Sequence, residues 1–231
     1  MAKTRVLLLG SEGIGTIAAL NLECGGQAHV TAVRRSNFQT VTDRGFEILD
    51  HGRLRNWRPS EVINAVPEVA HSGVSPFDYI VCTTKNIPDI GPPICDIIAP
   101  APFAKRFAQN ILSRISRIDA HEIAPGVIEQ IDHDNLQIGA FGGLSQTPNI
   151  DLPRETIATI LAKNPPERMI YPSMQKDVTK GNFLEHEVII GEVIREAQGR
   201  GIATPILSTL YHLWACLQWG TQQGKAGTRQ N

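Results

Sequence analysis

Apolar residues in the first third of the chain fall into short runs that end at glycine or at arginine. Residues 5–10 (RVLLLG) and 29–33 (HVTAV) are typical of buried parallel strands, and residues 13–22 between them have helical periodicity. This strand, helix and strand have the combined length that a parallel crossover needs. Residues 77–84 (FDYIVCTT) predict a further buried strand of the same kind.

The middle of the chain is predicted to contain loops and short strands. Residues 46–65 favour irregular or short-strand structure. Five prolines between residues 86 and 103 allow only a short helix around residues 95–98. Alternating apolar patches within residues 115–141 surround a turn at Pro125, which predicts antiparallel strands that complete the sheet.

The last third of the chain changes to a helical pattern. Residues 155–163, 173–199 and 205–223 all carry apolar residues at helical spacing. Pro205 suits the first turn of the last helix, where its missing N–H group costs nothing. We therefore expect a helical region to follow the predicted sheet.

Composition restricts the partners that the chain can have. The 231 residues are 42% hydrophobic and 19% charged, with a formal net charge of −1, so no basic excess indicates nucleic-acid binding. No apolar run approaches the roughly 20 residues that span a bilayer, so no membrane role is predicted. Four scattered cysteines, and two histidines (His121 and His186) without a neighbour at metal spacing, predict a cytoplasmic protein without a bound metal.

The loop after the first strand is an altered dinucleotide-binding motif. Gly10, Gly13 and Gly15 lie in GSEGIG, which would have the pattern G-x-G-x-x-G if Glu12 were glycine. Glu12 places a carboxylate where a diphosphate would lie, and repulsion at about 4 Å costs on the order of 1–4 kcal/mol. The fold class predicted from these patterns is α/β, with a Rossmann-like domain and a parallel sheet over residues 1–145.

Motifs outside the loop resemble those of ketopantoate reductases, especially the fungal members. They are VRRSN at 33–37, DYIVCTTK at 78–85, PSMQKD at 172–177, GNFLE at 181–185 and Thr204–Pro205. The resemblance implies that a helical domain follows the nucleotide domain. We predict a reduced, all-helical version of it over residues 146–231.

The same resemblance implies roles for individual residues. An arginine after the second strand binds the 2′-phosphate of NADPH in this family, a lysine after the later strand faces the cofactor, and a serine and a glutamate hold or polarise the keto acid. The candidate catalytic residues are Lys85, Ser173 and Glu185; the candidate substrate contacts are Met174, Asp177 and Asn182; the cofactor residues, if the site is retained, are Gly10, Gly13, Gly15 and Arg35.

Each of these residues also has a plain structural interpretation. Arg35 and Lys85 are equally explained as inherited surface charges. Ser173 is as well explained as a helix N-cap, because serine is a preferred residue there. Glu185 is equally explained as a solvated carboxylate.

Two parts of the family pattern have no counterpart in this chain. The strand that ends in Gln-Asn-Gly should fall between residues 102 and 113, where only Gln109–Asn110 is similar. The long helix with the catalytic lysine is missing, and the surroundings of Lys163, the nearest lysine, do not match. Without that ammonium a reductase loses its general acid. Loss of the helix should also uncover apolar faces, so we expect a homodimer.

Three functions follow from this shortened, degenerate pattern. The first is a repurposed catalyst without a cofactor, an isomerase or cyclase such as a Diels–Alderase, that acts on an apolar small molecule of fungal secondary metabolism by holding it in a reactive conformation. The second is an NADPH-dependent oxidoreductase similar to 2-dehydropantoate 2-reductase. The third is a pseudoenzyme that binds a small molecule without catalysis.

Overall fold

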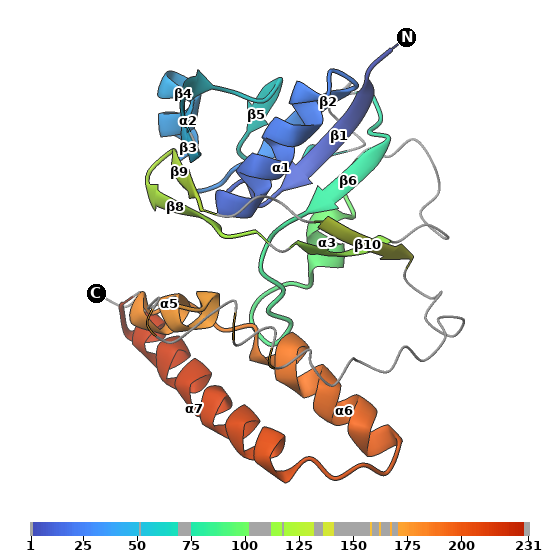
Figure 1. Ribbon diagram of the computed structural model, residues 1–231, viewed down its shortest axis with the longest axis vertical. Helices are drawn as coiled ribbons and strands as arrows, with labels where there is room; N and C mark the ends of the chain where they lie inside the picture. The colour runs from blue at the N-terminus through green and yellow to red at the C-terminus, as the bar shows by residue number, and fades with distance from the viewer. Residues whose placement is uncertain are drawn as a thin grey trace. The chain divides into compact units, whose positions relative to one another are not determined.

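A computed structural model gives the fold of the chain (Figure 1). It describes residues 2–50, 52–68, 75–101, 112–116, 118–131, 136–140, 158, 162, 167 and 171–228. The chain divides into a first unit, Met1–Lys85 with Cys95–Thr147, and a second unit, Asn86–Ile94 with Pro148–Asn231. Gln109–Asn110, Lys163 and all of the expected helix at 155–163 except residues 158 and 162 lie outside the described residues.

The first unit is built around a four-stranded parallel sheet. Its strand order is β5 (Glu61–Ile63), β2 (Ala28–Val33), β1 (Thr4–Leu9) and β6 (Tyr79–Cys82). Leu9 is in register with Val33 on one side and with Cys82 on the other, so these three strands end at the same edge. The buried strands expected at residues 5–10 and 29–33 and the α/β class are confirmed. The strand expected at residues 77–84 is present as β6, but it is only partly buried, with Tyr79 and Cys82 exposed.

Helix α1 (Gly13–Cys24) forms a middle layer of the first unit (Figure 1). Ala18 and Ala19 pack on the parallel sheet in a core cluster with four residues of β1 and β2. Ile17 points to a second cluster, which holds Val41 of helix α2 (Phe38–Arg44) and three strand residues. The strand residues of the two clusters are Val6, Leu8, Ala28 and Val30 in the first and Phe46, Ile48 and Ile128 in the second.

The second cluster belongs to a separate mixed sheet. Its order is β4 (Gly52–Trp57), β3 (Phe46–Asp50), β9 (Val127–Gln130) and β8 (Ala120–Ala124). β8 and β9 are antiparallel around the predicted turn, but β9 pairs in parallel with β3.

One strand prediction for the middle of the chain needs correction. The antiparallel strands do not complete the parallel sheet, because Ile128 is buried against Phe46 and Ile48 and holds β9 on β3. The short strands expected within residues 46–65 are present as β3, β4 and β5. Strands β7 (Leu112–Ser116) and β10 (Leu136–Ala140) form a two-stranded antiparallel sheet, and helix α3 (Ile94–Ile98) confirms the expected short helix.

The described part of the second unit from Tyr171 onward is helical. It contains α5 (Ser173–Thr179), a π-helical turn (Glu187–Gly191), α6 (Glu192–Gly199) and α7 (Pro205–Thr228). The predicted helix at 173–199 is interrupted between α5 and the π-helical turn, where Gly181 has a φ of 64° that favours glycine. The reduced helical domain and the start of the last helix at Pro205 are as predicted. None of the described helices is both long and apolar enough to span a membrane.

Candidate functional site

The loop between β1 and α1 keeps two of the packing roles of a dinucleotide-binding loop. Gly10 has a φ of 91°, and a Cβ there would lie 2.6 Å from the backbone nitrogen of Thr84. A Cβ on Gly15 would lie 2.1 Å from the carbonyl oxygen of Gly10. The first and third glycines therefore make the tight turn and the close approach of helix and strand.

The surface of the loop at Gly13 is covered by strand β8 of the same unit. A Cβ on Gly13 would lie 2.3 Å from the carbonyl oxygen of Ala120 and 2.5 Å from the Cα of His121. Figure 1 shows β8 passing the beginning of α1. Glu12 is the exposed N-cap residue of α1, and its side chain makes no capping hydrogen bond.

A buried arginine joins this strand to the loop. Arg34 follows β2, is 3% exposed, and donates hydrogen bonds to the carbonyl oxygen of Ser11 and to the carboxylate of Glu122 on β8. Its guanidinium carbon lies 5.3 Å from the ring centroid of Phe46. Arg35, the residue singled out by the sequence, is exposed. The arginine that contacts the loop is therefore Arg34, the neighbour of the residue that the sequence indicated.

These contacts test whether a nicotinamide dinucleotide fits the loop. Its pyrophosphate needs an open glycine surface at the start of the helix. Here the backbone of Ala120 packs against Gly13, and the exposed carboxylate of Glu12 adds negative charge where the motif has a glycine, whereas the charge of Glu122 is paired with that of Arg34. The side chain of Glu12 and the neighbouring strand therefore disfavour a pyrophosphate at this loop.

The candidate residues of the second unit include one oriented carboxylate. Glu185 is half-buried, and its Oε1 accepts a hydrogen bond from the backbone N–H of Asn86 at 2.8 Å. It is not simply solvated. Ser173 is exposed and is the first residue of α5, whereas Pro172 is the N-cap residue, so the capping interpretation of Ser173 was wrong.

Asp177 and Asn182 shape the turn that ends α5. Asp177 is buried, and its carbonyl oxygen accepts the backbone N–H of Asn182 at 2.8 Å. The side-chain amide of Asn182, an exposed residue, lies 3.5 Å from the Asp177 carboxylate. Met174 is half-buried near the beginning of the helix. Among the described residues no hydrogen bond joins Ser173 to Glu185, and Lys85 is an exposed residue at the end of its segment of the first unit.

A polar cluster that the sequence did not indicate lies around Glu187. Its carboxylate accepts hydrogen bonds from the Tyr211 hydroxyl and from Arg195, the latter at 2.9 Å. The hydrogen bond from Tyr211, and then that from Arg195, hold the pKa of Glu187 below its usual range; the pKa of Tyr211 is raised by the same hydrogen bond. The neighbouring His186 is 2% exposed, and its Nδ1 has no hydrogen-bond partner. Tyr211 is 24 residues away from Glu187, so no local pattern could have predicted this pair.

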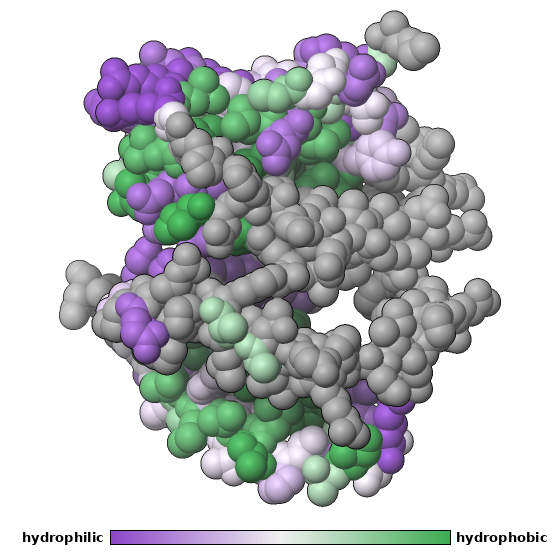
Figure 2. Space-filling model, in the orientation of Figure 1, coloured by the Kyte–Doolittle hydropathy of each residue, from purple (hydrophilic) through white to green (hydrophobic). Residues whose placement is uncertain are grey.

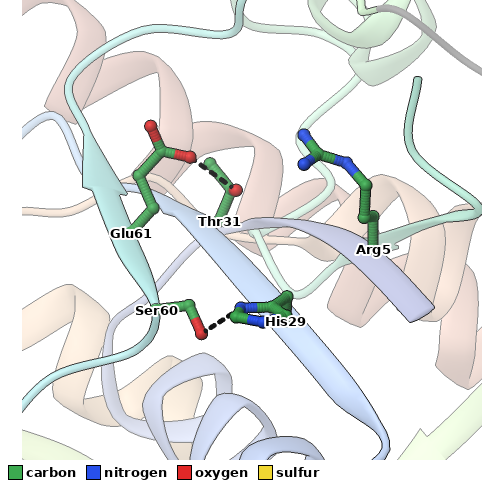
Figure 3. A pocket seen from close by; sticks show the side chains of 5 residues that line it. All are labelled: Arg5, His29, Thr31, Ser60 and Glu61. Atoms are coloured by element: carbon green, nitrogen blue, oxygen red, sulfur yellow. Dashed lines mark hydrogen bonds between the residues drawn. The ribbon is translucent and has the colours of Figure 1, made fainter. Parts of the chain in front are cut away.

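An open cavity of about 380 Å³ lies on the parallel sheet (Figure 3). Its polar lining contains two hydrogen-bonded pairs, His29 with Ser60 at 2.8 Å and Thr31 with Glu61 at 2.9 Å. Arg5 completes the lining, and its buried Nε has no hydrogen-bond partner. Arg5 and His29 lie near the amino ends of β1 and β2, away from the carboxyl edge where this class of sheet binds nucleotides. The cavity is therefore separate from the glycine loop.

No described group of three or more histidine, cysteine, aspartate or glutamate side chains is placed to hold a metal ion. All four cysteines, Cys24, Cys82, Cys95 and Cys216, are exposed and free.

Comparisons with known proteins agree with the fold. Residues 6–92 match the family model described as Ketopantoate reductase PanE/ApbA, and residues 106–218 match the one for the C-terminal part of that family. An uncharacterised protein of Saccharomyces cerevisiae is 25% identical over 333 aligned positions, which cover 93% of this chain and 94% of that protein. The alignment is longer than this chain, so it contains long gaps, as expected for a shortened member.

Solved structures of the same fold include reductases and a dehydrogenase. The 2-dehydropantoate 2-reductase of Geobacter metallireducens has a TM-score of 0.72 at 13% identity, over 91% of this chain and 99% of that one. The enzyme of the same name from Methylococcus capsulatus has a TM-score of 0.60 at 19% identity, over 94% and 97%. D-mandelate dehydrogenase, solved with NADH and anilino(oxo)acetate, has a TM-score of 0.67 at 14% identity, over 95% and 100%. The two family models together span most of the chain, and the chain belongs to the ketopantoate reductase family, a family of oxidoreductases.

Proposed function

We propose that this chain is a member of the ketopantoate reductase family that acts on a small molecule without a nicotinamide cofactor. One observation carries the proposal: the backbone of Ala120 lies against Gly13 at the start of α1, next to the position where a pyrophosphate would bind. Arg34 supports it, because its hydrogen bonds to Ser11 and Glu122 hold β8 in that position. A dinucleotide would have to displace a strand that a buried ion pair holds.

In the catalytic form of this proposal the protein is an isomerase or a cyclase, whose reactions need no hydride. Glu185 would supply the acid–base group, since the hydrogen bond from Asn86 fixes one carboxylate oxygen and the half-buried side chain can still meet a ligand. Ser173 is exposed at the start of α5 and would donate a hydrogen bond to a substrate carbonyl. A Diels–Alderase is one member of this class of enzymes. In the non-catalytic form of the proposal, the protein only binds its ligand.

A second candidate, an NADPH-dependent reductase, is favoured by different observations. Gly10 and Gly15 keep the close packing of a dinucleotide loop, and the exposed Arg35 follows β2 where the family binds a 2′-phosphate. The family comparison also favours a cofactor, because D-mandelate dehydrogenase binds NADH. This candidate requires β8 to leave the loop.

Calorimetric titration with NADPH separates the two candidates. We expect that the wild-type protein does not bind NADPH with a dissociation constant below about 1 mM, which corresponds to a binding free energy of about −4 kcal/mol. We also expect no such binding by Glu12→Gly, because the backbone of Ala120 still covers Gly13 in that variant. Micromolar binding that Arg35→Ala weakens would overturn the proposal and establish the reductase.

The catalytic form has its own measurement, which uses an enolisable 2-oxo acid as the probe. Exchange of its C3 protons in D₂O, followed by NMR, should be faster with the wild-type protein than with Glu185→Gln. Equal exchange rates with both proteins would remove the acid–base role of Glu185 and leave the binding form.

A further inference from the structure

The cavity on the parallel sheet has the size and the lining of a site for a small polar ligand. Its volume of about 380 Å³ lies near the lower end of the range of ligand pockets, which is about 300–1,000 Å³. All of its lining side chains carry a polar group. They come from β1, from β2 and from the beginning of β5, and are Arg5, His29, Thr31, Ser60 and Glu61 (Figure 3).

Arg5 is held in a fixed orientation but has no anion. Its backbone N–H donates a hydrogen bond to the carboxylate of Asp78 at 2.9 Å, and its carbonyl oxygen accepts the backbone N–H of Asp78 at 2.9 Å. Its guanidinium carbon lies 5.2 Å from the ring centroid of the buried Phe77. Among the residues that the structure describes, no side chain forms a hydrogen bond or an ion pair with this guanidinium. Its hydrogen-bonding capacity is therefore unused.

Arg34 shows which group is missing beside Arg5. The guanidinium carbon of Arg34 has the same kind of aromatic support, at 5.3 Å from the ring centroid of Phe46, and the guanidinium is paired with the carboxylate of Glu122. A guanidinium presents a planar fork of donors that matches a carboxylate. We therefore expect a carboxylate of the ligand to take the corresponding position at Arg5.

Glu61 adds a negative charge to the same cavity. Its Oε2 accepts the hydroxyl of Thr31, a buried residue in register with it on β2, and no described side chain donates to its Oε1. Arg5 and Glu61, both within the described part of the chain, form no ion pair with each other. Strand β2 lies between their strands, which makes the separation of β1 and β5 about 10 Å. Figure 3 shows the two side chains on opposite sides of the cavity.

The wall between these charges is fixed by helix α1. Oε1 of Glu23 accepts the backbone N–H groups of Val30 and Ser60, each at 2.8 Å, and so holds β2 and the residue before β5 together. The hydroxyl of Ser60 lies 2.8 Å from Nδ1 of His29. Groups that already have their positions lose little conformational entropy when a ligand binds.

We propose that this cavity binds a free amino acid with a neutral polar side chain. The carboxylate of the ligand pairs with Arg5 and its ammonium group with Glu61, while its side chain meets the hydrogen-bonded pair of His29 and Ser60. A simple anion is repelled by Glu61 and a simple cation by Arg5, whereas a zwitterion complements both charges. The site does not depend on the function proposed for the rest of the protein.

Titration of the isotope-labelled whole chain with L-glutamine, followed by NMR, tests the site. We expect a dissociation constant below about 1 mM. Two analogues lack one charged group each: 4-carbamoylbutanoate has no ammonium group, and 4-aminobutanamide has no carboxylate. Each should bind at least about 10-fold more weakly than L-glutamine, because a charge-assisted hydrogen bond is lost. No binding of L-glutamine in this range, or equal binding of all three compounds, overturns the proposal.

Two substitutions that remove a charge assign the ligand groups to their partners. Arg5→Gln should weaken the binding of L-glutamine at least about 10-fold and leave that of 4-aminobutanamide no weaker, because this analogue has no carboxylate. Glu61→Gln should weaken L-glutamine to a similar degree and leave 4-carbamoylbutanoate no weaker. The NMR spectrum of each variant, and the analogue that it still binds, show that the variant is folded. Unchanged affinity for L-glutamine in both folded variants places the ligand elsewhere and overturns the proposal.

The matched control is a pair of charges outside the cavity. Hydrophilic residues gather over β4 and α2 (Figures 1 and 2), and Arg53 of β4 is paired there with Glu47 of β3. Arg53→Gln and Glu47→Gln remove the same two charges and should leave the affinity for L-glutamine unchanged. Equal losses in these variants and in the cavity variants would show that net charge decides the binding, which also overturns the proposal.

Discussion

At the glycine loop the chain covers its own surface, whereas along α7 it leaves a surface open. The carbonyl oxygen of Ala120 is 2.3 Å from the position of a Cβ on Gly13, but nothing lies within 4 Å of the corresponding position on Gly220. Both surfaces are places where glycine permits a close approach. The first is covered by another strand of the same chain, and the second is exposed.

This difference shows that a sequence motif has to be interpreted together with the residues that contact it in the fold. Two of the loop glycines keep the close packing of a dinucleotide fold, although Glu12 and the strand beside Gly13 disfavour a pyrophosphate there. The sequence change at Glu12 and the covering strand β8 act in the same direction, since both make the beginning of α1 less accessible to an anion. The exposed glycines of α7 belong to no motif of the nucleotide site, yet their spacing is regular.

The largest expected effect tests what holds β8 on the loop. Arg34→Ala removes the buried guanidinium and leaves the half-buried carboxylate of Glu122 with only neutral donors, the N–H of Gly126 and the amide of Asn37, and breaking a buried ion pair costs about 3–5 kcal/mol. The matched control is Arg35→Ala, an exposed position where we expect a change within about 0.5 kcal/mol. Denaturant unfolding of both variants measures the difference. If both variants lose equally little stability, Arg34 does not hold β8 on the loop.

A smaller effect should follow from a side chain placed between the loop and β8. Gly13→Ala puts a methyl group where the backbone of Ala120 lies, so we expect a loss of about 1–3 kcal/mol from forced displacement. Gly25→Ala, at the other end of α1, meets only ordinary contacts at 3.6 Å and has a negative φ. It should be neutral or stabilising by up to about 1 kcal/mol. If thermal unfolding shows the same change in stability for both variants, β8 can be displaced from the loop at little cost in free energy.

Local patterns in the sequence predicted the elements of the fold well. The apolar runs of β1, β2 and β6 and the helical spacing of α1 and α7 depend on residues close together in the chain. The position of β9 could not be predicted in this way, because its partner β3 lies about 80 residues earlier and any exposed edge would satisfy its hydrogen bonds. Ile128 decides the pairing through its burial against Phe46, which is a tertiary contact.

The candidate site was less predictable for the same reason. Arg34 and Arg35 are adjacent and chemically identical, and only the carboxylate of Glu122, 88 residues away from Arg34, distinguishes them. The resemblance identified Glu185, but its hydrogen bond to Asn86 spans 99 residues and could not be seen in the sequence. The homodimer expected from a missing helix remains a proposal.

The smallest effect concerns the inner side of α7, where charge rather than shape holds the helix. The depressed pKa of Glu187 stabilises the fold above the unfolded pKa of about 4.3, and this contribution is lost as the pH falls through the folded pKa. Tyr211→Phe removes the hydrogen bond that lowers this pKa most, so it should cost about 1–2 kcal/mol at pH 7 and clearly less near pH 3. Urea unfolding at both pH values, with the exposed Tyr171→Phe as the unaffected control, measures this. An equal cost at both pH values would show that the Tyr211 hydroxyl acts through packing and not through the charge of Glu187.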